Sequence, residues 1–243
     1  MNDVPTTDSA AQVRGARMEP DRSRRLGADS RLAVDRMTVP RRRMRPFQRA
    51  LKRGMDIIVS AASLIALFPT MILTAVAIKL TSSGPIFYRW DVIGRNGMPF
   101  SGYKFRTMVV GADEMKKSLS HLNEMTGPVF KITRDPRVTP VGRFIRKFSI
   151  DEFPQLWSVL KGDMSLVGPR PVGPDEWAHF EEWQRRKLSV TPGMICLWHV
   201  NGKPKDFEQW IQMDLEYIDN WSLWLDLKIL AKGALYILLG KSC

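Results

Sequence analysis

The sequence has few residues that could hold a metal through sulfur or imidazole. Its 243 residues include only two cysteines, Cys196 and Cys243, and three histidines. No CxxC, paired Cys/His spacing or HExxH occurs, which argues against zinc-finger and zincin-type sites. Free thiols are typical of a reducing compartment such as the cytosol.

Familiar phosphate-binding loops and secretory signals are also missing. Neither GxxxxGK[ST] nor GxGxxG is present, so a protein of this sequence that handles phosphate must bind it largely through side chains. No apolar stretch follows the early arginines, which argues against a secretory signal peptide.

Basic residues are abundant at the N-terminal end. The formal charge is +12, and residues 1–53 supply +8 of it, with fourteen Lys/Arg and six Asp/Glu. Residues 1–46 lack apolar periodicity and are predicted to be a disordered basic tail. The dense stretch 41–53 fits two readings, a polybasic segment beside an anionic membrane or a nucleic-acid-binding tail.

An uncharged run of twenty-two residues covers 57–78. As a helix it would span roughly 33 Å, enough for a membrane core. No face of this run is polar, which argues against a core helix of a soluble protein. Pro69 divides it into arms of twelve and nine residues, each about half a bilayer long. We therefore predict, over 47–82, a polybasic segment and a proline-broken re-entrant helix; a spanning helix remains the alternative.

Residues 83–243 are predicted to form one small domain after the membrane segment, so the fold class is α+β and mostly helical. Alternation and turn residues predict strands within 84–110, and 111–125 reads as helical. Residues 175–188 and 206–238 carry aromatics at helical spacing. These are either core helices or interfacial amphipathic helices.

Two adjacent carboxylates, Asp151 and Glu152, precede a helical pattern that ends near Leu160. Pro154 places them at the start of that helix, where free N–H groups can hold a carboxylate and a phosphate together. Ser149-x-x-Glu152 is also the spacing of a capping box. Capping and catalysis are both consistent with the spacing.

The segment Gly168-Pro-Arg-Pro171 encloses Arg170 between two prolines. Fixed backbone lowers the entropy lost when the arginine binds, and guanidinium suits a bidentate grip on phosphate. The alternative is a tight turn with a solvated arginine.

These features together resemble a known family. The broken membrane helix, GPIFYRWDVIGRNG, YKFRTM, DPRVTPVGRFIRKFSIDEFPQLWSVLKGDMSLVGPRP, TPGMICLWHVNG and WSLWLDLKIL are similar to bacterial sugar transferases, the monotopic polyprenyl-phosphate phosphoglycosyl transferases. The resemblance covers about residues 47–239. It implies a monotopic membrane protein in which residues 83–243 form a small cytosolic catalytic domain.

The resemblance implies a role for several residues. Asp151 would be the nucleophile and a ligand of Mg²⁺, and Glu152 its catalytic neighbour. Arg146 and Arg170 match positions that contact phosphate. Lys104 and Asp226 match further functional positions.

It also implies the reaction and its partners. Asp151 would attack a UDP-sugar, expected to be a UDP-hexose. Undecaprenyl phosphate would take the sugar phosphate from the resulting aspartyl intermediate. Membrane lipids are expected partners, nucleic acid is not, and oligomeric state stays open. The expected location is the cytosolic face of the bacterial inner membrane, in exopolysaccharide or related glycan synthesis.

Three positions depart from the usual family pattern. Ile195-Cys196 replaces Thr-Gly, His199 replaces Gln, and Phe68 precedes the proline where Ser is frequent. The first departure motivates an alternative function, a catalytically impaired membrane scaffold of the same fold.

Overall fold

Helices dominate the computed structural model, which describes residues 44–240. Strands form two small sheets: β1 (Phe87–Ile93) pairs antiparallel with β2 (Pro99–Phe105), and β3 (Ser165–Val167) pairs parallel with β4 (Gly193–Ile195). The α+β, mostly helical prediction and the strands within 84–110 are confirmed. The predicted tail lies almost entirely outside the described residues.

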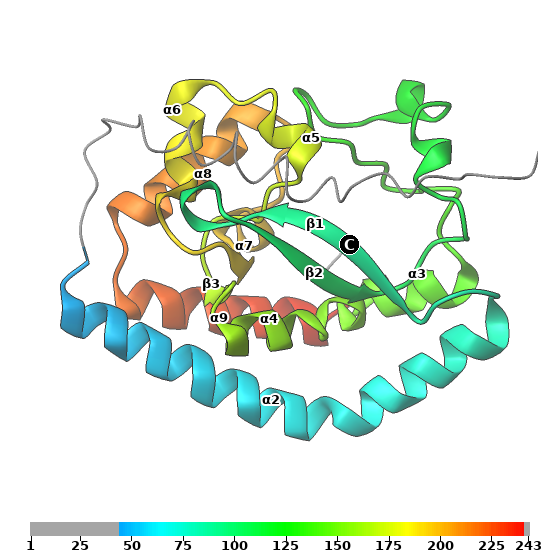
Figure 1. The fold of residues 1–243 in the computed structure, drawn as a ribbon, viewed down its shortest axis with the longest axis horizontal. Coiled ribbons are helices and arrows are strands. Elements are labelled where there is room, and N and C mark those ends of the chain that lie inside the picture. Colours follow the sequence, from blue (N-terminus) through cyan, green and yellow to red (C-terminus); the bar gives the residue numbers. More distant parts are fainter. Residues whose placement is uncertain (1–43, 241–243) are drawn as a thin grey trace, which may run out of the picture.

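The membrane segment belongs to one long helix, α2 (Pro46–Thr81), of 36 residues. Pro69 lies inside it, and Figure 1 shows α2 bent near its middle, with the rest of the chain on the concave side. The predicted break is thus a bend in a continuous helix. The Thr74 hydroxyl donates to the Thr70 carbonyl at 2.8 Å, and not to the carbonyl of Ile65 that Pro69 deprives of its N–H partner.

The outer surface of α2 is apolar and uncovered. Ile58, Ile65, Leu73 and Leu80 are between 70 and 81% exposed. Among the described residues, α2 is the one helix long and apolar enough to cross a membrane, and only 11% of its most apolar window is buried. A core helix of a soluble protein would be mostly buried, so that alternative is wrong. Exposed apolar surface of this extent is typical of contact with lipid.

The N-terminal end of α2 is bound to the rest of the chain by charged side chains. Lys52 Nζ donates to Asp226 Oδ2 at 2.7 Å and to a β3 carbonyl at 2.9 Å. The Arg53 guanidinium donates to the last carbonyls of α4 (Gln155–Lys161), both at 2.5 Å. Asp56 is buried and accepts from Ser165 Oγ and from the Leu166 N–H. Two cations of the predicted polybasic segment therefore face the protein interior and not a lipid surface.

The C-terminal end of α2 is bound by Arg106, which directly follows β2. Its guanidinium donates to the carbonyls of Ser82 and Ser83, just past the helix. Nearby, α2 packs on α3 (Pro140–Lys147). Both ends of the membrane helix therefore contact the same body of protein.

Two predicted helices are different in the structure. Residues 111–125 form only the 3₁₀ turns η2 (Glu114–Lys116) and η3 (Ser120–Leu122). The segment 175–188 is split into α5 (Pro174–Trp177), α6 (Glu182–Arg185) and η5 (Arg186–Ser189). Trp177 and Phe180 are buried there, whereas Trp183, on the same predicted face, is 39% exposed. Core packing explains the first two aromatics, and the single amphipathic helix is not formed.

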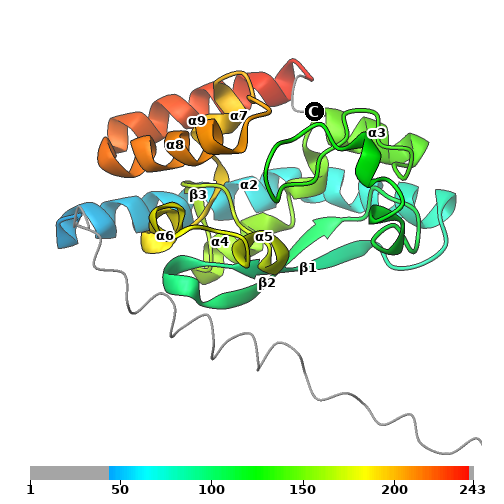
Figure 2. The same cartoon turned by 90° about the horizontal axis from the view of Figure 1, so that it is seen from above.

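The C-terminal part contains α7 (Leu197–Val200), α8 (Phe207–Asp219) and α9 (Leu223–Leu238). Figure 2 shows the β1–β2 hairpin on one side of α2 and α9 on the other. Trp210 and Trp221 are buried in the core, whereas Trp224 on α9 is 64% exposed. Core packing therefore explains Trp210 and Trp221. The exposed Trp224 is consistent with the other interpretation, an aromatic side chain at the level of the lipid headgroups.

We predict that Lys52→Met destabilises the protein by about 3 kcal/mol, because it leaves the buried Asp226 carboxylate without its cation. Arg49→Met, on the exposed surface one turn earlier, is the matched control and should change stability by less than about 0.5 kcal/mol. Thermal unfolding in detergent measures both. Equal midpoints for the two variants would contradict the internal role of Lys52.

Candidate active site

The carboxylate pair lies in a tight turn between two helices. Asp151 and Glu152 belong to η4 (Ile150–Glu152), which follows α3 and leads through Pro154 into α4. Ser149, directly before η4, has φ +49°, a left-handed conformation that costs free energy for a residue with a Cβ. The Ser149 side chain makes no capping hydrogen bond, and the N-cap of α4 is Pro154. The capping-box interpretation of Ser149 and Glu152, and of Asp151 as an N-cap, is therefore wrong.

Lys104 is the direct partner of the pair. Its Nζ donates to Glu152 Oε1 at 2.8 Å, and the two side chains are each partly exposed. The same ammonium lies 5.1 Å from the centroid of the Trp90 ring. The β1–β2 hairpin thus positions the Lys104 ammonium beside a turn that lies almost fifty residues later in the sequence.

The two carboxyls have opposite pKa shifts. Burial, and then the charge of Glu152, raise the pKa of Asp151 to about 6, against smaller opposing effects of Lys104 and Arg146. Burial also opposes ionisation of Glu152, but its cationic neighbours, Lys104 first, hold the pKa of that carboxyl below its usual value. At neutral pH, Glu152 is the firmly ionised member, and Asp151 is a comparatively basic carboxylate.

Arg146 and Arg170 complete a ring of positive charge. Arg146 Nε donates to Thr107 Oγ1 at 2.8 Å, and its charge acts on Asp151. The charge of Arg170 acts on Glu152. The structure therefore gathers five of the predicted site residues: Lys104, Arg146, Asp151, Glu152 and Arg170.

Arg170 is held by its surroundings and is not simply solvated. Its guanidinium lies 4.3 Å from the centroid of the Trp210 ring. Its backbone N–H donates to Asp214 Oδ1 at 3.2 Å, and Asp214 pairs with Lys187 at 2.7 Å, both side chains being 1% exposed. A stacked and anchored arginine loses little freedom when it binds an anion. The sequence reasoning did not identify Asp214, Lys187 or Trp210 as parts of the site.

His199 also belongs to this region. Burial lowers the pKa of His199 to about 4, so the ring is neutral at physiological pH. Its Nδ1 lies 3.2 Å from the Cys196 nitrogen and 3.3 Å from the Cys196 sulfur. The ring lines a cavity that Glu152 also lines. Cys196 and His199 both differ from the family pattern, and this shared difference is the sequence feature that points to their contact.

Asp226 lies in a different environment from the other predicted site residues. It is fully buried and accepts hydrogen bonds from Lys52 Nζ, Tyr217 Oη and Trp221 Nε1 at 2.7, 2.7 and 3.1 Å. These contacts join α2, α8 and α9. In the described structure Asp226 connects helices, and no hydrogen bond or ion pair joins it to the Asp151–Glu152 turn.

The donor set near the turn suits Mg²⁺. Within residues 44–240 no cluster of three or more His, Cys, Asp or Glu side chains could enclose a metal. Magnesium, however, is usually held by one or two carboxylates together with substrate phosphates. Asp151, with Glu152 beside it, meets that requirement.

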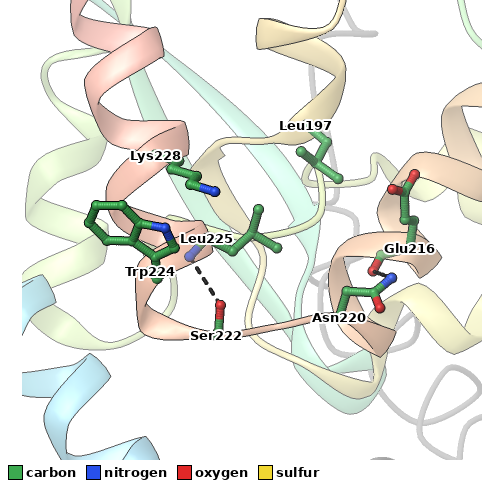
Figure 3. A pocket seen from close by; sticks show the side chains of 7 residues that line it. All are labelled: Leu197, Glu216, Asn220, Ser222, Trp224, Leu225 and Lys228. Atoms are coloured by element: carbon green, nitrogen blue, oxygen red, sulfur yellow. Dashed lines mark hydrogen bonds between the residues drawn. The ribbon is translucent and has the colours of Figure 1, made fainter.

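A second hollow has none of these groups in its lining. It is a pocket of about 240 Å³ at the turn between α8 and α9, and Figure 3 shows the side chains that line it. The residues that line it are Leu197, Glu216, Asn220, Ser222, Trp224, Leu225 and Lys228. None of them is a predicted site residue, so this hollow is not the candidate active site.

We predict that Asp151→Asn stabilises the protein at pH 7.5. The folded protein holds the Asp151 proton more tightly than an unfolded aspartate with a pKa near 3.8, so wild-type stability falls as pH rises from about 4 through about 6. The variant lacks this loss, which amounts to about 3 kcal/mol for a pKa raised from 3.8 to about 6, or about 6 to 12 °C in Tm. Thermal unfolding in metal-free buffer should show the gain at pH 7.5 and none at pH 4.

Asp175→Asn is the control for that comparison, because the Asp175 side chain is 91% exposed. It should leave Tm unchanged at both pH values. A Tm gain for Asp151→Asn that is the same at pH 4 and pH 7.5 would show that the Asp151 pKa is not raised.

The chain is similar to curated sugar transferases. It is 47% identical over 159 residues to Galactosyl transferase CpsE of Streptococcus agalactiae, covering 65% of this chain and 35% of that protein. It is 43% identical over 196 residues to Undecaprenyl-phosphate galactose phosphotransferase of Salmonella typhimurium, covering 78% and 41%. It is 37% identical over 194 residues to Exopolysaccharide production protein ExoY of Sinorhizobium fredii, covering 78% and 86%.

The match is with one part of the longer relatives, because this chain spans 35 to 41% of the first three curated proteins that it resembles. The model of the family described as Bacterial sugar transferase matches residues 47–240, which include α2 and every group of the site. The chain belongs to the bacterial sugar transferase family.

Proposed function

We propose that this protein transfers a hexose-1-phosphate from a UDP-sugar to undecaprenyl phosphate and so initiates an exopolysaccharide or related surface glycan. The observation that carries the proposal is the Asp151–Glu152 turn surrounded by Lys104, Arg146 and Arg170. A diphosphate is attracted by such a ring of cations. The relatives named as undecaprenyl-phosphate galactose and glucose phosphotransferases support the same substrate class.

The first half-reaction forms a covalent intermediate. A carboxylate oxygen of Asp151 attacks the β-phosphorus of the UDP-sugar, and the bond from that phosphorus to the bridging oxygen breaks, so UMP leaves. A pKa near 6 makes Asp151 more nucleophilic than an ordinary carboxylate while leaving it ionised at neutral pH. Arg146 and Arg170 offset the charge that the anionic nucleophile meets.

The second half-reaction releases the sugar phosphate. An oxygen of undecaprenyl phosphate attacks the same phosphorus, and the bond to Asp151 breaks, which regenerates the carboxylate. Glu152 stays ionised beside Lys104. It keeps the Lys104 ammonium directed at the turn, where that cation can contact substrate phosphate.

Asp151 would hold Mg²⁺ together with the diphosphate oxygens. When bound, the metal supplies charge neutralisation for the leaving UMP.

The membrane geometry that we propose is re-entrant, with the catalytic part on the cytosolic face. The support comes from the two ends of α2: Lys52 and Arg53 bind β3 and α4, and Arg106 binds the carbonyls just past the helix. A spanning helix would place these ends on opposite sides of a core about 30 Å thick. One body of protein could not then bind both.

A catalytically impaired scaffold is the second candidate, favoured by Ile195-Cys196 in place of Thr-Gly. Burial raises the pKa of the Cys196 thiol to about 12, so this residue is a core side chain and not a nucleophile. The charged site itself is complete, which favours the enzyme.

We predict that Asp151→Asn abolishes UMP release from a UDP-sugar, because the Asn amide cannot attack phosphorus. Glu152→Gln should reduce UMP release by about 10²-fold, because it removes only the carboxylate that holds Lys104 in place. The assay combines purified protein in detergent, Mg²⁺, undecaprenyl phosphate and a panel of UDP-sugars. Asp175→Asn serves as the exposed control. Full activity in Asp151→Asn would remove it as nucleophile, and no release by the unaltered protein with any sugar would favour the scaffold.

We predict that cysteines introduced at Phe47 and Leu80, 75 and 81% exposed, are both protected from an impermeant maleimide in intact cells. A re-entrant α2 leaves both positions on the cytosolic side. Cys243 is replaced by Ser in both variants, and buried Cys196 is kept. Permeabilised cells, in which both sites should react, are the control. Labelling of one site alone in intact cells would indicate a spanning helix.

A further inference from the structure

An apolar cavity of about 350 Å³ lies between the membrane helix and the catalytic turn. Its walls come from α2, η4, α4, β3, β4, α7 and α9, and most of the lining side chains are apolar. Val59, Ser63 and Leu67, at successive turns of α2, form one wall. The volume is at the lower end of the roughly 300–1,000 Å³ typical of ligand pockets.

One end of this cavity is polar and belongs to the active site. Glu152, His199 and Lys203 line it there. A ligand with an apolar body and an anionic head would therefore place its head beside the catalytic turn. A nucleotide or a sugar fits the rest poorly, because its hydroxyls would be buried against aliphatic walls without hydrogen-bond partners.

The contact between α9 and β4 sets the width of the cavity. Gly233 faces Ile195, and a Cβ at position 233 would lie 2.9 Å from Ile195 Cδ1 and 3.1 Å from its Cγ2. Both residues line the cavity. The bulky Ile195 side chain thus fits because α9 has no side chain at position 233.

We infer that this cavity binds the first isoprene units of the lipid acceptor, so that its phosphate meets the Asp151 intermediate at the Glu152 end. The inference rests on the proposed function and adds a binding site to it. The α2 wall of the cavity adjoins the exposed apolar surface of the same helix. The remainder of the long polyprenyl chain can therefore stay in the membrane while its head enters the protein. Ile195 and Gly233 determine how much of the chain enters.

The test separates the two half-reactions. Exchange of labelled UMP into UDP-sugar reports the first and needs no lipid, whereas the KM for undecaprenyl phosphate reports the second. Ser63→Phe fills the cavity from α2 and should raise that KM at least about tenfold, with exchange unchanged. Ala62→Phe adds the same ring at the adjacent position, which is exposed and outside the lining. It should alter neither quantity.

A second pair of variants guards against misfolding of Ser63→Phe. Gly233→Ala pushes Ile195 into the cavity and should also raise the KM for the lipid. Combining Gly233→Ala with Ile195→Val removes the Cδ1 atom of the close contact. The double variant should return the KM for the lipid to that of the unaltered protein.

The outcomes are distinct. Normal exchange with an unchanged lipid KM in both Ser63→Phe and Gly233→Ala would overturn the cavity assignment and leave the proposed function standing. A raised KM in Ala62→Phe equal to that in Ser63→Phe would also overturn it. No exchange in the unaltered protein would overturn the proposed function, and the acceptor site with it.

Discussion

The attachment of α2 to the catalytic part through charged side chains is the constraint on which the rest of the structure depends. Apolar contacts also hold α2 in place, because Ile78 is buried with Phe105 and Ile145 and other α2 side chains pack against the core. Such contacts are not directional, whereas Lys52, Arg53 and Asp56 at one end and Arg106 at the other make specific hydrogen bonds. Charged hydrogen bonds shielded from water are directional, so they fix where the two ends of α2 lie on the catalytic part.

This attachment supports the proposal that two substrates of different solubility meet at one site. The Asp151–Glu152 turn precedes α4, and α4 packs on α2. The turn is therefore fixed relative to the membrane helix by a short path of contacts, and not by a flexible loop. Lys104 and Arg170 arrive from elsewhere in the chain, β2 and the turn after β3. In the proposed reaction, this arrangement would let a water-soluble diphosphate and a lipid phosphate react at the same turn.

The sequence predicted the local features well and the long-range ones poorly. The strands within 84–110 depend on neighbouring residues and are confirmed. The Asp151–Glu152 pair lies in a turn before α4, close to the predicted helix start. The capping alternative at Ser149 was equally consistent with spacing, because a left-handed serine leaves no trace in a single sequence. The contacts of Lys52 and Arg53 with the protein interior were not predicted. The sequence of a basic segment is the same whether its cations contact lipid headgroups or protein oxygen atoms. The aromatic pattern of 175–188 was ambiguous for the same reason: burial of Trp177 depends on what the rest of the chain places over it.

The network around Asp226 has a consequence for how this protein can be made soluble. Asp226 is fully buried, and one of its three donors comes from the membrane helix. Removing α2 would therefore leave a buried carboxylate without its cation and would also free the carbonyls of α4 that Arg53 covers. The membrane helix is as much a part of the folded core as it is an anchor. Soluble versions of this protein would better keep α2 and exchange its outward-facing apolar residues for polar ones.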